Sequence, residues 1–144
     1  MADHETRGLT LLNDTDHTAE VQRAIDAARA VMADHVNALN QGDEAALAAT
    51  LHFPHYRLAG SEMTVWETAE TYLADFHARA GTGWHHSAWD ALDVIAAEPA
   101  KVHLDVRFTR FREDGSAMGS FRSLWVLSDK GGVWAAQLRS SFAP

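Results

Sequence analysis

The sequence has no cysteine and no long apolar segment. With Cys 0 in 144 residues, it excludes a disulfide framework, a thiolate nucleophile and a Cys-ligated zinc site. The first ten residues carry charges at Asp3, Glu5 and Arg7 and lack the apolar stretch of a signal peptide or membrane anchor. No later run approaches the length that crosses a membrane. We therefore expect a cytoplasmic protein that does not associate with membranes.

Positive charge is also scarce. The 12 Lys and Arg against 20 Asp and Glu give a formal net charge of -8. A surface of this sign repels phosphate backbones, so nucleic-acid binding lacks its main electrostatic driving force and we expect no such partner. The 9 His titrate near neutrality and are the natural source of acid-base groups.

The chain length suits one domain that buries its own core, since 47% of its residues are hydrophobic. We predict a flexible N-terminal tail over residues 1–17 and a single domain over residues 18–144. Helical periodicity indicates a long amphipathic helix over 20–40. Asp43 can cap a short helix over 44–51, and Thr68 a third over 69–80.

The remaining segments alternate like strands and are separated by turn residues. The predicted strands are 56–59 and 63–66 in a small hairpin, followed by 84–97, 101–112, 117–128 and 133–142. The predicted fold class is therefore α+β, with three N-terminal helices packed on a curved, mainly antiparallel sheet in a cone-shaped roll.

A two-residue turn at Asp114-Gly115 places Phe108 opposite Phe121 and Arg107 opposite Arg122. One face of the sheet then collects apolar side chains, and we expect the helices to cover it. These are Val102, Leu104, Val106, Phe108, Phe121, Trp125, Leu127, Trp134, Ala136 and Leu138.

The opposite face mixes polar and apolar residues and suits a partner subunit. On it, Arg107, Arg122 and Arg139 are predicted side by side, with Asp90 next to Arg107. Adjacent cations repel one another unless anions lie among them. The row is either an ion-pair ladder neutralised by Asp90 and Asp105 or a site for a carboxylate or phosphate.

The element order resembles the nuclear transport factor 2-like, or cystatin-like, α+β roll over residues 18 to 142. The stretches that carry the likeness are Ala-Leu-Asn-Gln-Gly-Asp at 38–43, His-Phe-Pro-His at 52–55 and Gly-Val-Trp at 132–134. His-Phe-Pro-His and the closing Arg-Ser-Ser-Phe at 139–142 also resemble uncharacterised bacterial proteins with SnoaL-like domains.

This resemblance implies a cone-shaped pocket between sheet and helices and a homodimer formed through the outer sheet face. It also implies, for the enzymes of the superfamily, metal-free proton transfer on small hydrophobic substrates. Isomerase-like members carry an acidic base where this chain has His55-Tyr56-Arg57, so their carboxylate chemistry is not carried over. Fold alone does not settle function, because non-catalytic members share it.

His52 and His55 flank Pro54, where we expect the chain to pass from helix to strand at a pocket rim open to water. A His there can accept a proton from carbon beside a carbonyl, while Tyr56 or a Trp N–H stabilises the oxyanion. The catalytic candidates are therefore His55, His52 and Tyr56. Alternatively, each His caps backbone groups at the break.

Aromatic side chains are the candidates for the pocket wall. Trp66, Trp89, Phe108 and Trp125 can line a site for a flat apolar ligand, although core packing explains such rings equally well. Arg110 is either a snorkelling rim residue or the anchor of a ligand carboxylate.

His85 and His86 open the first long strand, so we expect the two imidazoles to point to opposite faces and only one to reach the pocket. A metal site from His52, His55 and one of these two lacks a recognisable ligand spacing, so we expect no metal and no cofactor.

The sequence thus predicts a homodimeric protein that binds a small hydrophobic ligand. If this protein is an enzyme, the sequence predicts a metal-independent acid-base enzyme of the isomerase, cyclase or dehydratase type. A non-catalytic binding or assembly module is the alternative, and a subunit of a larger oxygenase-type assembly is a third. An open pocket with two or more polar side chains favours ligand binding, whereas a dry, closed core favours the module.

Overall fold

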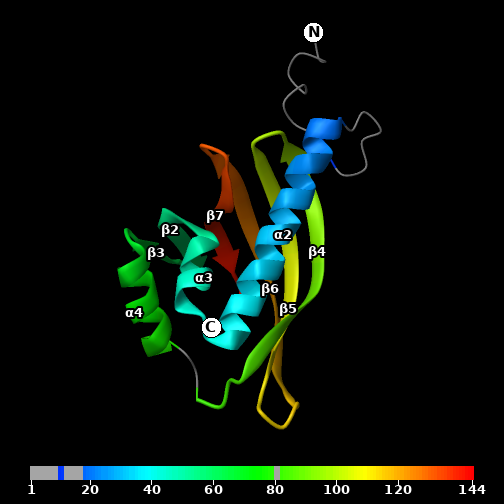
Figure 1. Cartoon of the computed structure of the whole chain (residues 1–144). Coiled ribbons are helices and arrows are strands. Elements are labelled where there is room, and N and C mark those ends of the chain that lie inside the picture. Colours follow the sequence, from blue (N-terminus) through cyan, green and yellow to red (C-terminus); the bar gives the residue numbers. More distant parts are fainter. Residues whose placement is uncertain (1–9, 12–17, 80–81) are drawn as a thin grey trace.

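The computed structural model describes residues 10–11, 18–79 and 82–144 and shows helices lying against one curved sheet (Figure 1). The helices are α2 (Ala19–Gln41), α3 (Glu44–Ala49) and α4 (Ala69–Arg79). The strands are β1 (Thr10–Leu11), β2 (Leu51–Ala59), β3 (Glu62–Trp66), β4 (His86–Glu98), β5 (Lys101–Phe111), β6 (Ala117–Lys130) and β7 (Val133–Ser141). The sheet order is β1-β4-β5-β6-β7-β2-β3, antiparallel except for the β7–β2 pair. This arrangement confirms the predicted α+β roll.

Most of the predicted tail, residues 1–17, lies outside the described residues. Its described part, β1, pairs with Ala96 and Ala97 of β4, a short strand that the sequence pattern did not indicate. The division into tail and domain stays a prediction.

The long helix α2 packs mainly on β4, with further contacts to β5 and β7 (Figure 1). It begins where the Val21 N–H donates to the Thr18 hydroxyl, and it ends at Gly42. Gly42 has φ of 68°, a left-handed conformation that favours glycine because it has no Cβ. None of the described helices is both long and apolar enough to span a bilayer.

The predicted β5–β6 register is confirmed, with Phe108 opposite Phe121 and Arg107 opposite Arg122. The turn itself differs, because the Arg112 N–H donates to the Ser116 carbonyl and leaves three residues, not two, in the loop. An extra residue at Met118 restores the count, since Arg110 pairs with Gly119 but Phe111 with Ala117. The longer turn and the extra residue at Met118 compensate each other, so the rest of the β5–β6 pair has the predicted register. The inner side of these strands is buried as predicted, at Val102, Leu104, Val106, Trp125 and Leu127.

The predicted register of β7 is wrong beyond its middle. Leu127 pairs with Ala136, but the next residue, Val126, pairs with Leu138, so Gln137 is an extra residue in β7. A β-bulge of this kind reverses the inward and outward alternation after it. As a result, Leu138 lies on the outer side and is 39% exposed, although the sequence pattern placed it in the core.

The same bulge removes Arg139 from the predicted arginine row. Arg139 is buried in the core at 9% exposure, whereas Arg107 and Arg122 face each other on the outer side. Arg122 holds Asp105 through two hydrogen bonds of 2.8 and 2.7 Å. Asp90 does not lie opposite Arg107, because β4 also carries an extra residue there. Asp105 thus balances the charge of Arg122, which bears out one half of a ladder that the sequence interpretation assigned to Asp90 and Asp105.

An irregular segment of β2 lies against the Gln137 bulge. Leu51 pairs with Ala136, and the next aligned pair is Tyr56 with Leu138, so residues 52–55 fall outside regular pairing. The predicted passage from helix to strand within 52–55 is therefore an irregular stretch inside β2 instead.

Side chains replace the ladder hydrogen bonds that this segment lacks. These bonds run from Gln137 Nε2 to the Pro54 carbonyl (2.6 Å), from His52 Nε2 to the Ser128 carbonyl (2.8 Å) and from His55 Nδ1 to the Ala136 carbonyl (3.0 Å). A buried carbonyl without a donor is costly, so the three side chains stabilise the paired irregularities.

We expect Gln137→Met to lower the free energy of unfolding by about 1–3 kcal/mol, because the Pro54 carbonyl loses its donor. Urea denaturation measures the change. The matched control is Gln22→Met in α2, where the lost bond to Asp26 is exposed, and a change within about 0.5 kcal/mol is expected. Equal effects at both positions would show that the Gln137 bond contributes nothing.

Candidate functional site

Polar and aromatic side chains meet in the core between the helices and the sheet. One comes from each of α2, β2, β3, α4, β4, β6 and β7. We call the following residues the interior cluster: His35, His55, Trp66, Tyr72, Trp89, Trp125 and Arg139.

His55 is the most enclosed polar member, at 0% exposure. Its ring stacks on Trp66 at 6.0 Å and meets the edge of Tyr72 at 6.4 Å. Because the Ala136 carbonyl can only accept, the proton of this neutral ring is on Nδ1 and Nε2 carries a lone pair. In the described part of the chain, His55 Nε2 and Ser128 Oγ are the buried side-chain polar atoms that have no hydrogen-bond partner. A ligand O–H or N–H would satisfy Nε2.

Arg139 brings a positive charge into the same region. Its guanidinium carbon lies 5.0 Å from the ring centre of Trp125 and 6.0 Å from that of Trp66. Aromatic faces attract cations of this kind, and the attraction grows when water is excluded. The positive charge of Arg139 also disfavours protonation of the two neighbouring imidazoles, His35 and His55.

His35 approaches the cluster from α2. Its Nδ1 lies 2.8 Å from the Thr50 hydroxyl, which donates its own proton to the Leu47 carbonyl, so His35 is the donor. Its ring lies 5.0 Å from Trp125 and 6.1 Å from Trp89. Sequence reasoning missed His35, although its place three residues after a buried Met and seven after a buried Ala is a helical signal.

Burial and, as the next cause, the charge of Arg139 together lower the pKa of both His35 and His55 to about 3. The bond to the Ala136 carbonyl opposes this shift at His55. Both rings are therefore neutral at pH 7. In the ligand-free protein, His55 Nε2 is a hydrogen-bond acceptor and a weak base.

These depressed pKa values predict acid sensitivity. Between about pH 6.5 and pH 3, the unfolded chain binds protons at His35 and His55 that the folded chain does not, so stability is complete above 6.5 and falls as pH decreases. The dependence of unfolding free energy on pH, from urea denaturation, should be shallower in His35→Gln than in the wild type. An unchanged slope would contradict the buried, neutral state of His35.

The three catalytic candidates do not come together. Tyr56 lies opposite Val65 and Leu138, two exposed residues of the outer face, so it points away from His55. His52 is half-buried and occupied by its backbone bond. The expected rim position is wrong for His55, because β2 already begins at Leu51 and the His55 side chain lies in the core at 0% exposure.

The ligand-binding candidates are better grouped. Trp66, Trp89 and Trp125 belong to the interior cluster. Phe108 lies 5.9 Å from Trp89, and the Arg110 guanidinium lies 5.8 Å from Phe108. Ring contacts therefore continue from the interior cluster toward the β5–β6 hairpin, where Arg110 lies.

His85 and His86 do not point to opposite faces, because β4 begins only at His86. Their Nδ1 atoms lie 3.0 Å apart, and His86 stacks on Phe111 at 4.8 Å. Among residues 18–79 and 82–144, no three His, Asp or Glu side chains form a group that could hold a metal.

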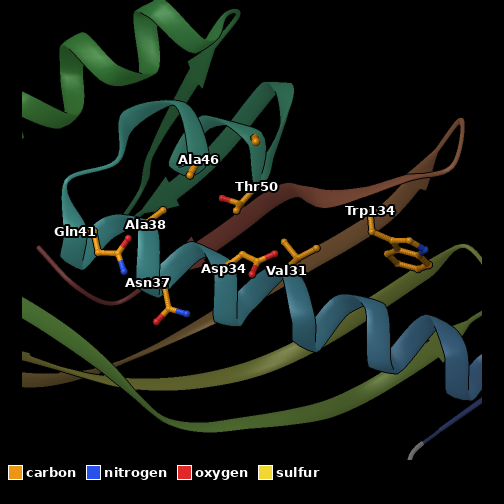
Figure 2. Close-up of a pocket in the computed structure, with 9 residues that line it drawn as sticks. Val31, Asp34, Asn37, Ala38, Gln41, Ala46, Thr50 and Trp134 are labelled. Atoms are coloured by element: carbon orange, nitrogen blue, oxygen red, sulfur yellow. The ribbon is translucent and has the colours of Figure 1, made fainter.

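Two hollows lie away from His55 and Arg139. One, of about 340 Å³, lies between α2, α3 and the start of β7 (Figure 2). It is lined by Val31, Asp34, Asn37, Ala38, Gln41, Ala46, Ala49, Thr50 and Trp134. The other, of about 620 Å³, is lined by residues 58–60 and 140–144. Thr50 links the first hollow to the interior cluster through its bond to His35.

The burial of the interior cluster and the chemistry of its side chains favour different functions. Burial of the cluster favours a module without chemistry, whereas the unpartnered His55 nitrogen favours a bound ligand.

No known family matches the sequence, and no curated protein is similar to it. Solved structures are similar. A protein of unknown function with a cystatin-like fold from Nostoc punctiforme PCC 73102 is 15% identical over 83% of this chain and 90% of its own, with TM-score 0.70. A nuclear transport factor 2-like protein of unknown function from Shewanella oneidensis MR-1 is 10% identical over 83% and 99%, with TM-score 0.68.

This chain has the nuclear transport factor 2-like, cystatin-like fold. A further structure of this fold, from Catenulispora acidiphila in complex with S-DNPA, is 18% identical over 83% of this chain and 94% of its own, with TM-score 0.64. At these identities, the likeness concerns the nuclear transport factor 2-like fold alone. The closer resemblance to SnoaL-like proteins stays a prediction.

Proposed function

We propose that the chain binds a small, largely hydrophobic molecule at the interior cluster, with His55 Nε2 as its polar anchor. The observation that carries this proposal is a fully buried imidazole nitrogen with no partner among the described residues, set between the rings of Trp66 and Tyr72. Aromatic walls with a few convergent polar groups are typical of small-molecule sites. The Catenulispora acidiphila protein, whose structure contains S-DNPA, supports the proposal by analogy of fold.

Ligand entry requires a side-chain movement, because His55 is fully buried. Tyr72 covers His55 from α4 and stacks on Phe76 of the same helix at 6.4 Å. The helix α4 packs mainly on α3 and β3 and not on the central strands. An outward movement of α4 is therefore the simplest way to open the cluster.

The enzymatic form of this function is metal-independent acid-base turnover of the isomerase, cyclase or dehydratase type in the cytoplasm, without a cofactor. His55 Nε2 would accept the proton. Its pKa of about 3 makes it a weak base in the empty protein, so turnover depends on a substrate that changes its surroundings.

His55→Asn tests the role of Nε2. The Asn amide can still donate to the Ala136 carbonyl, while the acceptor at the Nε2 position is removed. For a substrate found by screening, we expect kcat/KM to fall about a hundredfold or more, because a general base is lost. His52→Asn is the matched control, and kcat/KM should change little. Undiminished turnover in His55→Asn would remove His55 from the mechanism.

The second candidate function is a binding or assembly module without chemistry, which the closed packing of the interior favours. Native mass spectrometry of the purified protein separates the two. A retained small molecule supports the pocket protein. A ligand-free mass together with a stoichiometric complex with a larger protein supports the module.

We also propose a homodimer formed through the outer sheet face. Exposed apolar side chains lie on four neighbouring strands, β6, β7, β2 and β3, and we call them the outer patch: Leu58, Met63, Val65, Leu124 and Leu138. Leu58 pairs with Met63, and Tyr56 pairs with both Val65 and Leu138. A contiguous apolar area of this kind marks an interaction surface.

Leu138→Glu should convert the dimer into a monomer, because it places a charge in the outer patch. Light scattering after size-exclusion chromatography gives the mass. Ile95→Glu on β4 is the matched control, since Ile95 is 43% exposed and Leu138 39%. A wild-type protein that is monomeric at micromolar concentration would contradict the dimer.

A further inference from the structure

We infer that the molecule bound at the interior cluster is a phenol, whose flat ring takes the place of the Tyr72 ring and whose hydroxyl donates to His55 Nε2. The inference rests on the proposed function and names its ligand class.

The first argument is the direction of the unpartnered nitrogen. In an imidazole, Nδ1 and Nε2 point away from each other across the ring. Nδ1 of His55 points to the Ala136 carbonyl on β7, so Nε2 is directed away from β7. The strand on the other side of β2 is β3, and α4 packs against β3 at the edge of the molecule (Figure 1). Nε2 is therefore directed toward the side from which α4 contributes Tyr72.

The second argument is the shape of the space that Tyr72 occupies. The side chain is 2% exposed and its ring meets Trp66 edge to face at 5.3 Å and 86°. It also lies 6.4 Å from His55 and 6.2 Å from Phe53. An outward movement of α4 carries the Tyr72 ring with it and leaves a flat space between these three side chains. A ligand ring of the same size restores the aromatic contacts that Tyr72 gives up, as benzene fills an apolar cavity of its own size.

The third argument is the chemistry of the acceptor. A neutral imidazole nitrogen that carries only a lone pair accepts from O–H or N–H, whereas a carbonyl, ether or carboxylate oxygen repels it. A ligand without a donor leaves the buried nitrogen unpaired, so the site should reject it. The pKa of His55, lowered to about 3 chiefly by burial, is far below the value of about 10 for a phenol. The shared proton therefore stays on the ligand oxygen, and the ligand binds as a neutral phenol.

The probes 4-methylphenol and anisole test the inference, because they are isomers of similar size and only 4-methylphenol carries a donor. Isothermal titration calorimetry gives Kd of both probes for the wild type, His55→Asn and His52→Asn. His55→Asn removes the acceptor at the Nε2 position. His52→Asn is the control, since Nε2 of His52 is already bonded to the Ser128 carbonyl.

We expect the wild type to bind 4-methylphenol at least about tenfold more tightly than anisole. His55→Asn should lose this preference, and His52→Asn should keep it in full. In addition, 4-methylphenol and not anisole should shift the ¹⁵N signal of His55 Nε2. That shift distinguishes binding at this nitrogen from binding in either of the two hollows.

Tyr72→Ala removes the ring that the ligand is inferred to replace. This variant should bind 4-methylphenol at least about tenfold more tightly than the wild type, because no side chain has to be displaced. An affinity equal to or below that of the wild type would contradict the inferred place of the ligand ring. The comparison of the two probes on the wild type does not depend on this variant, so it tests the inference even where Tyr72→Ala does not fold.

Equal affinity of the wild type for the two isomers would overturn the inference and leave the proposed function intact. A preference for 4-methylphenol that persists in His55→Asn would overturn it as well. Binding of neither probe would also overturn it, and a thermal-shift screen of other hydrophobic compounds then decides whether the proposed function stands.

Discussion

The extra residue at Gln137 is the constraint on which the polar interior depends. Without it, the pairing of Leu127 with Ala136 would continue to Leu124 with Arg139, and strict alternation would turn Arg139 to the outer face. With it, Ala136 and Arg139 both face the core, and the Ala136 carbonyl is in place to accept from His55. The facing irregularity of β2 over residues 52–55 is stabilised by the Gln137 amide, so the two departures from regular pairing support each other.

This interior combines features that small cores avoid. A cation and two imidazoles occupy space that apolar side chains could fill, and burial of such groups costs free energy even when aromatic faces compensate in part. The Nδ1–H of His35 donates to the Thr50 hydroxyl, whereas the lone pair of His55 Nε2 accepts no hydrogen bond from the described residues. The free-energy cost of burying this nitrogen without a partner is consistent with a site that a ligand completes. Burial of the interior alone therefore does not identify the protein as a structural module.

The fold was predictable from the sequence because its signals are local. Helical spacing, the Asp43 cap and strand alternation gave the element order, and the β5–β6 register was correct although its turn was not. The site was predictable only in part. Trp66, Trp125 and His55 were named, but burial of His55 and the inward direction of Arg139 depend on irregularities at 52–55 and 137, which have no local sequence signature. A single bulge reverses the side of the sheet to which every later side chain points, and counting along a strand cannot detect it.

The most direct test concerns the proton on His55. In ¹⁵N NMR of the ligand-free protein at pH 7, the ring should be neutral with its proton on Nδ1, as donation to the Ala136 carbonyl requires. That result leaves Nε2 as a bare acceptor inside the core. A proton on Nε2, or a charged imidazolium, would contradict the account, because no lone pair would then be available to a ligand.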